Sequence, residues 1–527
     1  MHRGGWWWRL AWIAGTCAAA GLVGGCGTLP QRVAPPHSAA LPPVAASPLA
    51  KIAQVSQPAP DLTGLRLMPF GLFSLDARIQ LAQRSQSTLD VQYYQIHNDK
   101  TGRLLLRSLR DASLRGVRVR LLVDDLYTTG GDTLFRGLAE FDNVEVRLFN
   151  PFCCLRNGFI SKFAGSIFDY RRVNRRMHNK LFIADGVMAV AGGRNIADEY
   201  FMRNESANFV DMDAFIAGAL VPQLATIFDE YWNSAQVYPV EAIIEPGGDR
   251  AAWRVQFDDM VDDGEQMMTL ELPPFDILGY GPISEDFDAG QLGLIWGKAV
   301  AFADPPWKVS ESSDVRSRSV SVNTDVLDRA TRADSEVVIS SPYLIPGPDG
   351  VQLFADLTAR KVKVTILTNS LAATDEPLVH TGYARYRESM LRSGVDLYEL
   401  SPILIQRNKR LGFLGSSLGR LHAKTVVIDR SIVFIGSMNL DPRSASKNTE
   451  LGIIIDSPQF AKEVLRVINI SKLQSSYRVR FAPDSYVLEW LGIEDGMEVI
   501  LTAEPDTTFL MRLQSLLLGP FVPESEL

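Results

Sequence analysis

The chain has 527 residues, of which 46% are hydrophobic and 22% are charged; this composition is typical of globular proteins and excludes a disordered or collagen-like chain. With 53 Lys and Arg against 61 Asp and Glu the net charge is −8, which argues against a broad nucleic-acid-binding surface but allows a local basic pocket. Four cysteines in such a length exclude a disulfide-stapled scaffold.

The N-terminus has the pattern of a secretion signal. Arg3 and Arg9 flank the start of an apolar stretch, residues 10–23, that is too short to span a bilayer comfortably. Val-Gly-Gly-Cys at residues 23–26 resembles the lipobox of bacterial lipoproteins. The resemblance implies a signal peptide over residues 1–26, lipidation of Cys26, and a body held outside the cytoplasm on the inner or outer membrane. A plain secretion signal or an uncleaved anchor is the alternative.

Residues 27–60 are rich in Pro and Ala, which predicts an extended tether between this anchor and the folded body. The body then shows one order of elements twice, a strand, a helix and a strand, over residues 88–123 and again over 336–367. Val117 and Val362, at equivalent places, are 362−117 = 245 residues apart. We therefore predict an α/β fold of two homologous lobes, residues 61–240 and 321–527, with an insertion over 241–320 between them.

Two histidines have nearly the same surroundings, one in each predicted lobe, at an offset of 422−178 = 244 residues. The first motif region, about 172–199, contains His178, Lys180, Asp185 and a Gly-Gly-Arg-Asn stretch that ends at Asn195. The second, about 416–443, contains His422, Lys424, Asp429 and a Gly-Ser-Met-Asn stretch that ends at Asn439. In a strand, residues i and i+2 face the same side, so each histidine and its lysine are expected to project together.

The chemistry of these residue types favours phosphoryl transfer. Histidine is a nucleophile and a proton donor near neutral pH, and lysine and asparagine can donate hydrogen bonds to phosphoryl oxygens. We expect the two copies to meet around one phosphodiester, where one imidazole attacks phosphorus and the other protonates the leaving alkoxide. The spacing of the neighbouring residues does not indicate metal ligands, and no cofactor is predicted, since the two lysines already supply positive charge.

The two motifs, HxKxxxxD followed by GGxN or GSxN, resemble those of the phospholipase D superfamily from about residue 61 onward. The resemblance implies two lobes with mixed sheets around one shared active site, and a metal-independent reaction through a phosphohistidine. It implies that His178 is the nucleophile and His422 the general acid. The catalytic set it predicts is His178, Lys180, Asp185, His422, Lys424 and Asp429, with Asn195 and Asn439 binding phosphate.

Carboxylates outside the catalytic pair complete the predicted site. Asp185 and Asp429 lie five residues beyond each lysine, where they are better placed to fix a strand and its turn than to touch substrate. By the family pattern, Asp211 and Glu450 are the carboxylates that would hold the imidazoles in the required tautomer. The alternative for Asp211 is a solvated loop carboxylate.

Segments at residues 192–201, 303–308 and 504–508 resemble bacterial cardiolipin synthases, especially the C type. This implies an enzyme that acts at a phospholipid membrane and joins phosphatidylglycerol to a second phospholipid; a helper protein is left open. If water resolves the intermediate, the protein is instead a phospholipase D. A nuclease of the same superfamily is a further alternative, disfavoured by the acidic balance and the lipid anchor; a lipid-binding relic is disfavoured by two intact motifs.

Basic and apolar runs beside the motifs are open to two interpretations. Arg171, Arg172, Arg175 and Arg176 precede the first histidine, and Arg407, Lys409, Arg410 and Arg420 precede the second. They suit anionic head groups or are solvated loops. Apolar runs at 152–155, 159–160 and 411–414 either dip into a membrane or belong to the core. The apolar segment 509–518 is equally consistent with contact with a membrane and with packing on the body.

Overall fold

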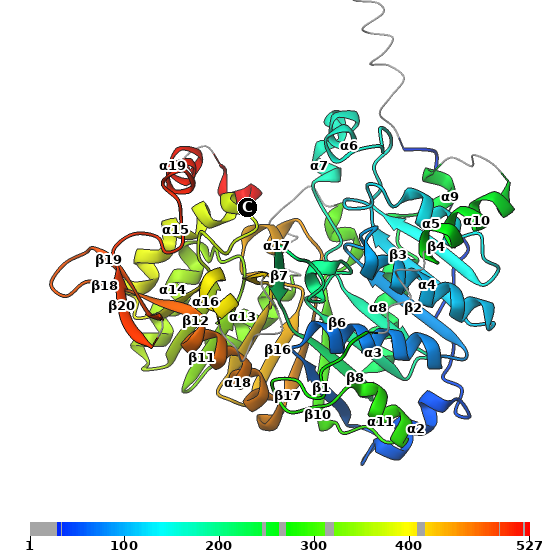
Figure 1. The fold of residues 1–527 in the computed structure, drawn as a ribbon, viewed down its shortest axis with the longest axis horizontal. Coiled ribbons are helices and arrows are strands. Elements are labelled where there is room, and N and C mark those ends of the chain that lie inside the picture. Colours follow the sequence, from blue (N-terminus) through cyan, green and yellow to red (C-terminus); the bar gives the residue numbers. More distant parts are fainter. Residues whose placement is uncertain are drawn as a thin grey trace, which may run out of the picture.

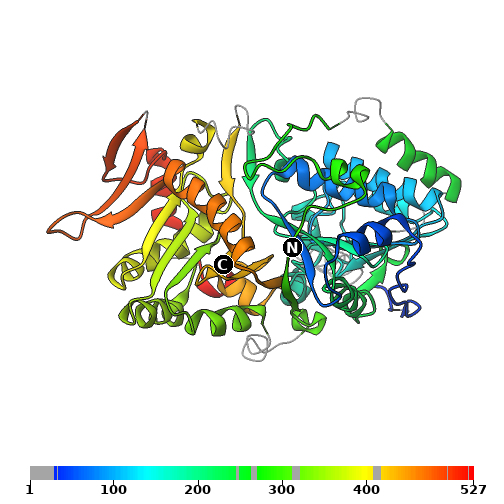
Figure 2. The same cartoon turned by 90° about the horizontal axis from the view of Figure 1, so that it is seen from below.

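The structure is a computed structural model that describes residues 29–32, 34–244, 249–262, 270–310, 321–407, 417–494, 496–519 and 522–527. Cys26 and the rest of the predicted signal peptide lie outside these residues. Two α/β lobes stand side by side, the first blue to green and the second yellow to red, in both views (Figures 1 and 2). In the part of the chain that is described, no helix combines the length and the apolar character needed to cross a bilayer.

The first lobe is built on a mixed sheet with strand order β9-β4-β3-β2-β5-β6-β8-β1. Its central strands are parallel and almost entirely buried, as expected for a sheet covered on both faces. The strands are β1 (Thr63–Met68), β2 (Thr88–Tyr93), β3 (Arg118–Asp124), β4 (Val144–Phe149), β5 (Leu181–Ala184), β6 (Met188–Gly192), β8 (Asp213–Gly218) and β9 (Val237–Pro239).

The second lobe repeats this order, β13-β12-β11-β15-β16-β17, with the same parallel trio, and extends it by three antiparallel strands. Its strands are β11 (Glu336–Ser340), β12 (Lys363–Asn369), β13 (Asp396–Leu400), β15 (Thr425–Ile428), β16 (Ile432–Gly436), β17 (Leu451–Asp456), β18 (Ser476–Phe481), β19 (Leu488–Glu494) and β20 (Met497–Leu501).

Helices cover both faces of the sheets. In the first lobe, α3 (Gly71–Arg84) and α4 (Lys100–Leu114) pack into one core, while α8 (Val221–Trp232) packs into a second core. This second core continues into the other lobe, where α18 (Pro458–Gln474) contributes to it. Helices α14 (Gly347–Ala359) and α15 (Pro377–Arg392) belong to the core of the second lobe. The two lobes therefore share buried apolar contacts and do not touch only at their surfaces.

One strand corrects the predicted insertion over residues 241–320. Strand β10 (Ile295–Ala303) pairs with β17 as β1 pairs with β8, so it is the second lobe's counterpart of β1. It also pairs with β1 and thereby joins both lobes into one 18-stranded sheet. The sequence missed it because a short, mostly apolar run carries no period that assigns it to either lobe.

The predicted tether is also corrected, because much of residues 29–60 packs on the first lobe. Helix α2 (Pro48–Ser56) is capped by the side chain of Ser47 and buries Leu49 and Ala53, which lie four residues apart on one helix face. Further upstream, the hydroxyl of Ser38 accepts a hydrogen bond from the Trp232 indole at 3.0 Å. Pro and Ala content alone did not distinguish a docked segment from a free one.

Candidate active site

Two backbone contacts between the lobes bring the motifs together. Strands β7 (Ala207–Val210) and β14 (Leu418–Leu421) form a two-stranded parallel sheet, and the next residues along the chain are Asp211 and His422. On the other side, Met177 and Thr449 form an isolated parallel bridge, and the next residues are His178 and Glu450. The pseudo-twofold repeat of the chain thus places the motif histidine of each lobe beside a carboxylate of the other lobe.

The resulting histidine–carboxylate pairs both cross the lobe interface. Nδ1 of His178 lies 2.9 Å from Oε2 of Glu450, and Nδ1 of His422 lies 2.6 Å from Oδ2 of Asp211. The histidines are 7% and 4% exposed and both carboxylates are fully buried. The two carboxylates predicted to orient the imidazoles are therefore the ones that touch them, each from the opposite lobe.

The motif lysines lie on the same side as their histidines. Nζ of Lys180 donates to the carbonyl oxygen of His178 at 2.7 Å and lies 5.1 Å above the ring of Tyr94. Nζ of Lys424 donates to the carbonyl oxygen of His422 at 2.5 Å and lies 2.7 Å from Nδ1 and 3.1 Å from Nε2 of that ring. The second lysine therefore contacts its imidazole directly, whereas the first reaches only the backbone and an aromatic face.

Burial sets the protonation states of this cluster. Burial, reinforced by the charges of Lys180 and Lys424, lowers the pKa of both histidines well below their usual value. The same burial raises the pKa of Asp211 and of Glu450 to about 7, although the lysines oppose the shift. Because each lysine acts on both histidines, the two motifs share one electrostatic environment, in which the imidazoles are neutral near neutral pH.

Further residues hold Glu450 in place. The hydroxyls of Ser437 and Ser444 donate to its carboxylate, the latter at 2.8 Å. Its backbone N–H donates to Asp304, which is also ion-paired with buried Lys308 at 2.7 Å. The segment 303–308, singled out in the sequence only for its resemblance to cardiolipin synthases, thus supports the carboxylate behind His178.

The Gly-Gly pair of the first motif makes room for Asp211. A Cβ atom on Gly193 would lie 2.2 Å from Oδ1 of Asp211, and one on Gly192 would lie 2.3 Å from Oδ1 of Asp213. Asp213 is in turn ion-paired with buried Arg78 at 3.0 Å and with Arg194 at 3.4 Å. These glycines are needed for close approach of the carboxylate loop.

Asp185 and Asp429, although predicted within the catalytic set, lie where they fix a turn. Asp185 accepts hydrogen bonds from the backbone N–H groups of residues 86–88, and Asp429 accepts equivalent bonds from those of residues 334–336. Both adopt a left-handed φ of 50°. Burial opposes ionisation of Asp429, but these donors lower its pKa to about 2. Each carboxylate thus ties the end of one strand to the start of its antiparallel neighbour in the sheet, β5 to β2 and β15 to β11.

The motif asparagines and two tyrosines complete the surroundings. Nδ2 of Asn195 donates to the hydroxyl of Tyr200 at 2.8 Å, while Oδ1 of Asn195 and of Asn439 are buried without a hydrogen-bond partner among the described residues. The Tyr94 ring meets His178 edge-on at 4.9 Å, and Tyr200 meets His422 at 5.0 Å. Tyr200 lies in the segment 192–201 that resembles cardiolipin synthases, and Tyr94 lies outside both motif regions, but neither was predicted as a site residue. Phosphate binding by the asparagines stays a prediction.

The arginines before His178 have different environments. Arg176 is buried and ion-paired with Asp124 at 3.1 Å, Arg172 pairs with Asp169 at 2.6 Å, and Arg175 donates to the carbonyl oxygen of Ser446 in the other lobe at 3.0 Å. Lys409 and Arg410 lie outside the described residues. Three of the four arginines before His178 therefore stabilise the fold through these contacts, and Arg171 is the exposed one.

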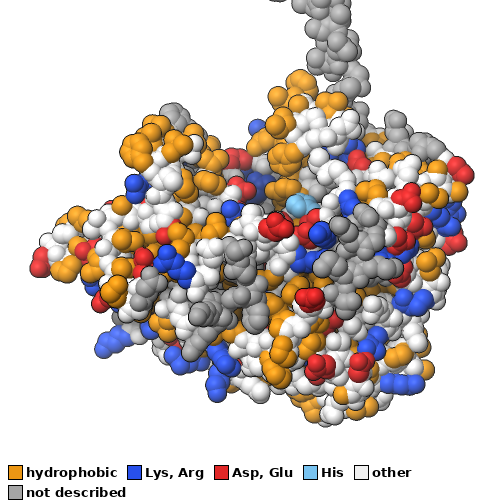
Figure 3. Space-filling view, in the orientation of Figure 1, with side chains coloured by type: hydrophobic (Ala, Val, Ile, Leu, Met, Phe, Trp, Pro, Cys, Tyr) orange, Lys and Arg blue, Asp and Glu red, His pale blue; other side chains and the backbone are white. Residues whose placement is uncertain are grey.

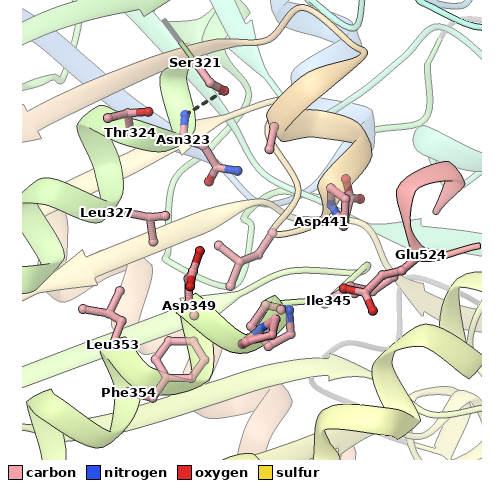
Figure 4. Close-up of a pocket in the computed structure, with 17 residues that line it drawn as sticks. Ser321, Asn323, Thr324, Leu327, Ile345, Asp349, Leu353, Phe354, Asp441 and Glu524 are labelled. Carbon is pink, nitrogen blue, oxygen red and sulfur yellow. Dashed lines mark hydrogen bonds between the residues drawn. The ribbon is translucent and has the colours of Figure 1, made fainter. Parts of the chain in front are cut away.

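Other groupings of polar side chains lie apart from the motif histidines. Within the described ranges, two sets have metal-ligand spacing, His97 with Asp99 and Glu199, and His380 with Glu399 and Glu504. A pocket of about 340 Å³ is formed partly by the residues directly after Asn439, and its lining includes Asp349, Asp441 and Glu524 (Figure 4). Its carboxylates do not suit a phosphate group, so the histidine cluster remains the candidate active site.

Comparisons with known proteins agree with this geometry. A family model described as "Cardiolipin synthase, PLD-like domain" matches residues 78–232 and 326–470. Cardiolipin synthase C of Escherichia coli is 37% identical over 87% of this chain and 96% of that protein. Cardiolipin synthase A of Pseudomonas fluorescens is 26% identical over 76% of this chain and 66% of that protein. Phosphatidylserine synthase of Haemophilus influenzae shares the fold, with a TM-score of 0.53, 14% identity, and coverage of 79% of this chain and 87% of that one.

Proposed function

This chain belongs to the cardiolipin synthase family of the phospholipase D superfamily, and we propose that it joins phosphatidylglycerol to a second phospholipid through a phosphatidyl-histidine. The observation that carries the proposal is the pair of histidine–carboxylate contacts that cross the lobe interface. Two neutral imidazoles, each held at Nδ1, leave two Nε2 atoms to act on one phosphodiester from opposite sides. No cofactor is required by this scheme.

In the first step, Nε2 of His178 attacks the phosphorus of phosphatidylglycerol, and the bond from phosphorus to the glycerol oxygen breaks. Glu450 accepts a hydrogen bond from Nδ1–H of His178, which favours the tautomer whose Nε2 carries the lone pair. Burial raises the pKa of Asp211 to about 7, and in its protonated form Asp211 donates to Nδ1 of His422, so that Nε2 of His422 carries a proton. His422 gives this Nε2 proton to the departing glycerol oxygen while its Nδ1 takes the proton of Asp211. The ammonium group of Lys424, next to the second ring, and that of Lys180 offset the charge of the pentavalent phosphate.

In the second step, a hydroxyl group of a second phospholipid attacks the phosphatidyl-histidine. His422 takes the proton of that hydroxyl and the bond from phosphorus to Nε2 of His178 breaks, which restores both residues. With phosphatidylglycerol as acceptor the product is cardiolipin. If water replaces the acceptor, the product is phosphatidic acid, so the balance between transfer and hydrolysis depends on the exclusion of water.

The location of the enzyme follows from the N-terminal pattern. We propose that Cys26 is lipidated and that the body works outside the cytoplasm against a bacterial membrane, where its lipid substrates are. The lipobox-like Val-Gly-Gly-Cys supports this; it fits either the inner or the outer membrane.

Acyl-labelled phosphatidylglycerol offered to the purified protein tests the proposal. Labelled cardiolipin with release of glycerol is expected, whereas phosphatidic acid without cardiolipin would replace the synthase by a phospholipase D. In His178→Ala both products should disappear, and in His422→Ala label should remain attached to the protein when the reaction is quenched in alkali. His37→Ala, which removes an exposed histidine on the N-terminal segment, is the matched control and should retain activity.

A further inference from the structure

We infer that two apolar protrusions, one from each lobe, form a bilayer-docking face that seats the mouth of the active site against the lipid surface. The inference rests on the proposed function in that it takes the substrate to be a lipid. The first protrusion comprises residues 155–170 and contains α6 (Phe159–Gly165); it continues into α7 (Tyr170–Val173). The second is α19 (Phe509–Leu518).

The first protrusion has its polarity reversed. Ile160 is 83% exposed and Phe168 is 84% exposed, whereas Lys162 on the same helix is fully buried. The ammonium group of Lys162 reaches inward to the hydroxyl of Thr128 at 2.7 Å and to Asp125 at 3.5 Å. A helix in water normally turns its apolar side chains inward, so this arrangement indicates that the outer surface meets an apolar medium.

The second protrusion shows the same exposure. Helix α19 has ten residues, none of them buried, and one charged side chain, Arg512. Phe509 and Leu516 are 72% and 71% exposed, and Leu510, Leu517 and Leu518 are exposed as well. The helix touches the body at α15, yet it leaves these apolar side chains exposed.

Both protrusions rise from the same side of the molecule, at the top of Figure 1, and Figure 3 shows apolar side chains on each with a hollow between them. A series of ring contacts leads from the first one to the active site. Phe159 stacks on Tyr127 at 6.0 Å, Tyr127 meets Tyr94 at 5.3 Å, and Tyr94 meets His178 at 4.9 Å. The exposed surface and the proposed nucleophile are thus three contacts apart.

The chain after α19 fastens the second protrusion to the first. Glu526 accepts a hydrogen bond from Asn174, the C-cap of α7, at 2.8 Å and pairs with Lys447 at 2.6 Å. These contacts join the C-terminal residues to the end of α7 and to Lys447, which follows the second motif region.

Charge agrees with a lipid surface as the occupant. Residues 155–173 contain a single carboxylate, Asp169, which is ion-paired with Arg172 at 2.6 Å, and residues 509–519 contain none. The exposed cations are Arg171 on α7 and the partly exposed Arg512 on α19. Apolar side chains with flanking arginines and no free carboxylate match an interface with anionic lipid head groups.

The start of the described chain lies on the same side. Arg32 donates to the carbonyl oxygen of Ser234 at 2.9 Å, near β9, and this dark-blue segment is at the top of the first lobe in Figure 1. Two residues lie between Cys26 and the first described residue, Leu29, and the three residue steps allow an anchor on Cys26 to reach about 10 Å from this point. Such an anchor would hold the face with the two protrusions toward the membrane.

The structure separates the two interpretations of the apolar run at 152–155. Phe152 is fully buried against Phe163 and Arg176 and belongs to the core, whereas Leu155 is 52% exposed. The run at 411–414 lies outside the described residues.

Photo-crosslinking with the full chain in vesicles of phosphatidylglycerol and phosphatidylcholine tests the docking face without depending on activity. Benzoylphenylalanine replaces Phe168, Leu517 or, as control, Leu473, which is 62% exposed on α18, a helix that belongs to neither protrusion. We expect lipid adducts at the first two positions about tenfold above the control. Equal labelling at all three positions, or crosslinks between two protein chains in place of lipid adducts, would overturn the inference.

A kinetic comparison separates this inference from the proposed function. The double variant Phe168→Glu, Leu517→Glu should lose about tenfold of its turnover on vesicles but keep its turnover on monomeric short-chain phosphatidylglycerol, and Leu473→Glu should keep both. Equal loss on both substrates would contradict docking. If the unmodified chain turns over neither substrate, the proposed function fails, and the crosslinking result still decides the docking face.

Discussion

Replacing Glu450 by glutamine removes the negative charge behind His178 and keeps the shape of the side chain. The carboxylate lies 2.9 Å from Nδ1 of His178, is fully buried, and also accepts hydrogen bonds from two serines. Loss of a hydrogen bond to a charged group costs about 1.5–3 kcal/mol, which is about 10- to 100-fold in rate. If the new amide donates to Nδ1, the proton moves to Nε2, and the loss rises toward about 10⁴-fold, as in other histidine–carboxylate pairs.

The assay is formation of cardiolipin from labelled phosphatidylglycerol in Glu450→Gln between pH 5 and 9, with thermal unfolding to show that the fold persists. Because the pKa of Glu450 is raised to about 7, its titration should shape the acid side of the profile, and that dependence should change in the variant. Glu463→Gln is the matched control, since Glu463 is half-buried and accepts a hydrogen bond from Tyr280 but contacts neither motif histidine in the described residues. Turnover within about threefold of the unmodified enzyme would refute the orienting role.

Three further results are expected. Asp429→Asn should cost about 1 kcal/mol of unfolding free energy in urea with little loss of turnover, because the Asp429 carboxylate holds backbone amides. Since folding lowers the pKa of Asp429 from 3.8 to about 2, the contribution of this carboxylate to stability should be full above about pH 4 and should fade below it. A difference in unfolding free energy that does not depend on pH would contradict this. Burial lowers the pKa of Lys424 to about 8, so kcat/KM should fall as the pH rises above this value; a flat alkaline profile would exclude a role for its charge. Gly193→Ala, whose new Cβ would lie 2.2 Å from Asp211, should lower turnover at least about tenfold, whereas Gly293→Ala, with 3.7 Å to its nearest neighbour, should not; equal rates would show that the loop yields.

The local part of the site could be predicted from the sequence because it depends on short spacings between residues that recur in both motifs. The i, i+2 relation of His178 and Lys180 fixes their common side, and the second copy 244 residues later indicates the second lobe. The order of strands around each motif follows from the same repeat. The match of the family model to two separate ranges is consistent with this division into two lobes.

The long-range part could not be predicted. Asp211 meets His422, and not the histidine of its own lobe, because β7 pairs with β14. These two strands are about two hundred positions apart in the sequence, and each is only four residues long. The assignment of β10 and of α2 failed for a related reason: their places are set by tertiary contacts with partners distant in sequence, not by a local period.

In the proposed mechanism, the crossed carboxylates make the orientation of the attacking histidine depend on both lobes being assembled. The first lobe supplies His178 but not the carboxylate that sets its tautomer, and the second lobe supplies His422 but not Asp211. A lobe that opened away from the other would separate Glu450 from His178 and leave the imidazole free to rotate, so in this mechanism the site is competent only while the lobes are closed. Strand β10, which pairs with strands of both lobes, and the shared apolar core oppose such opening. Both imidazoles are therefore oriented when the protein folds, and the free energy of orienting them is not required again in each catalytic cycle.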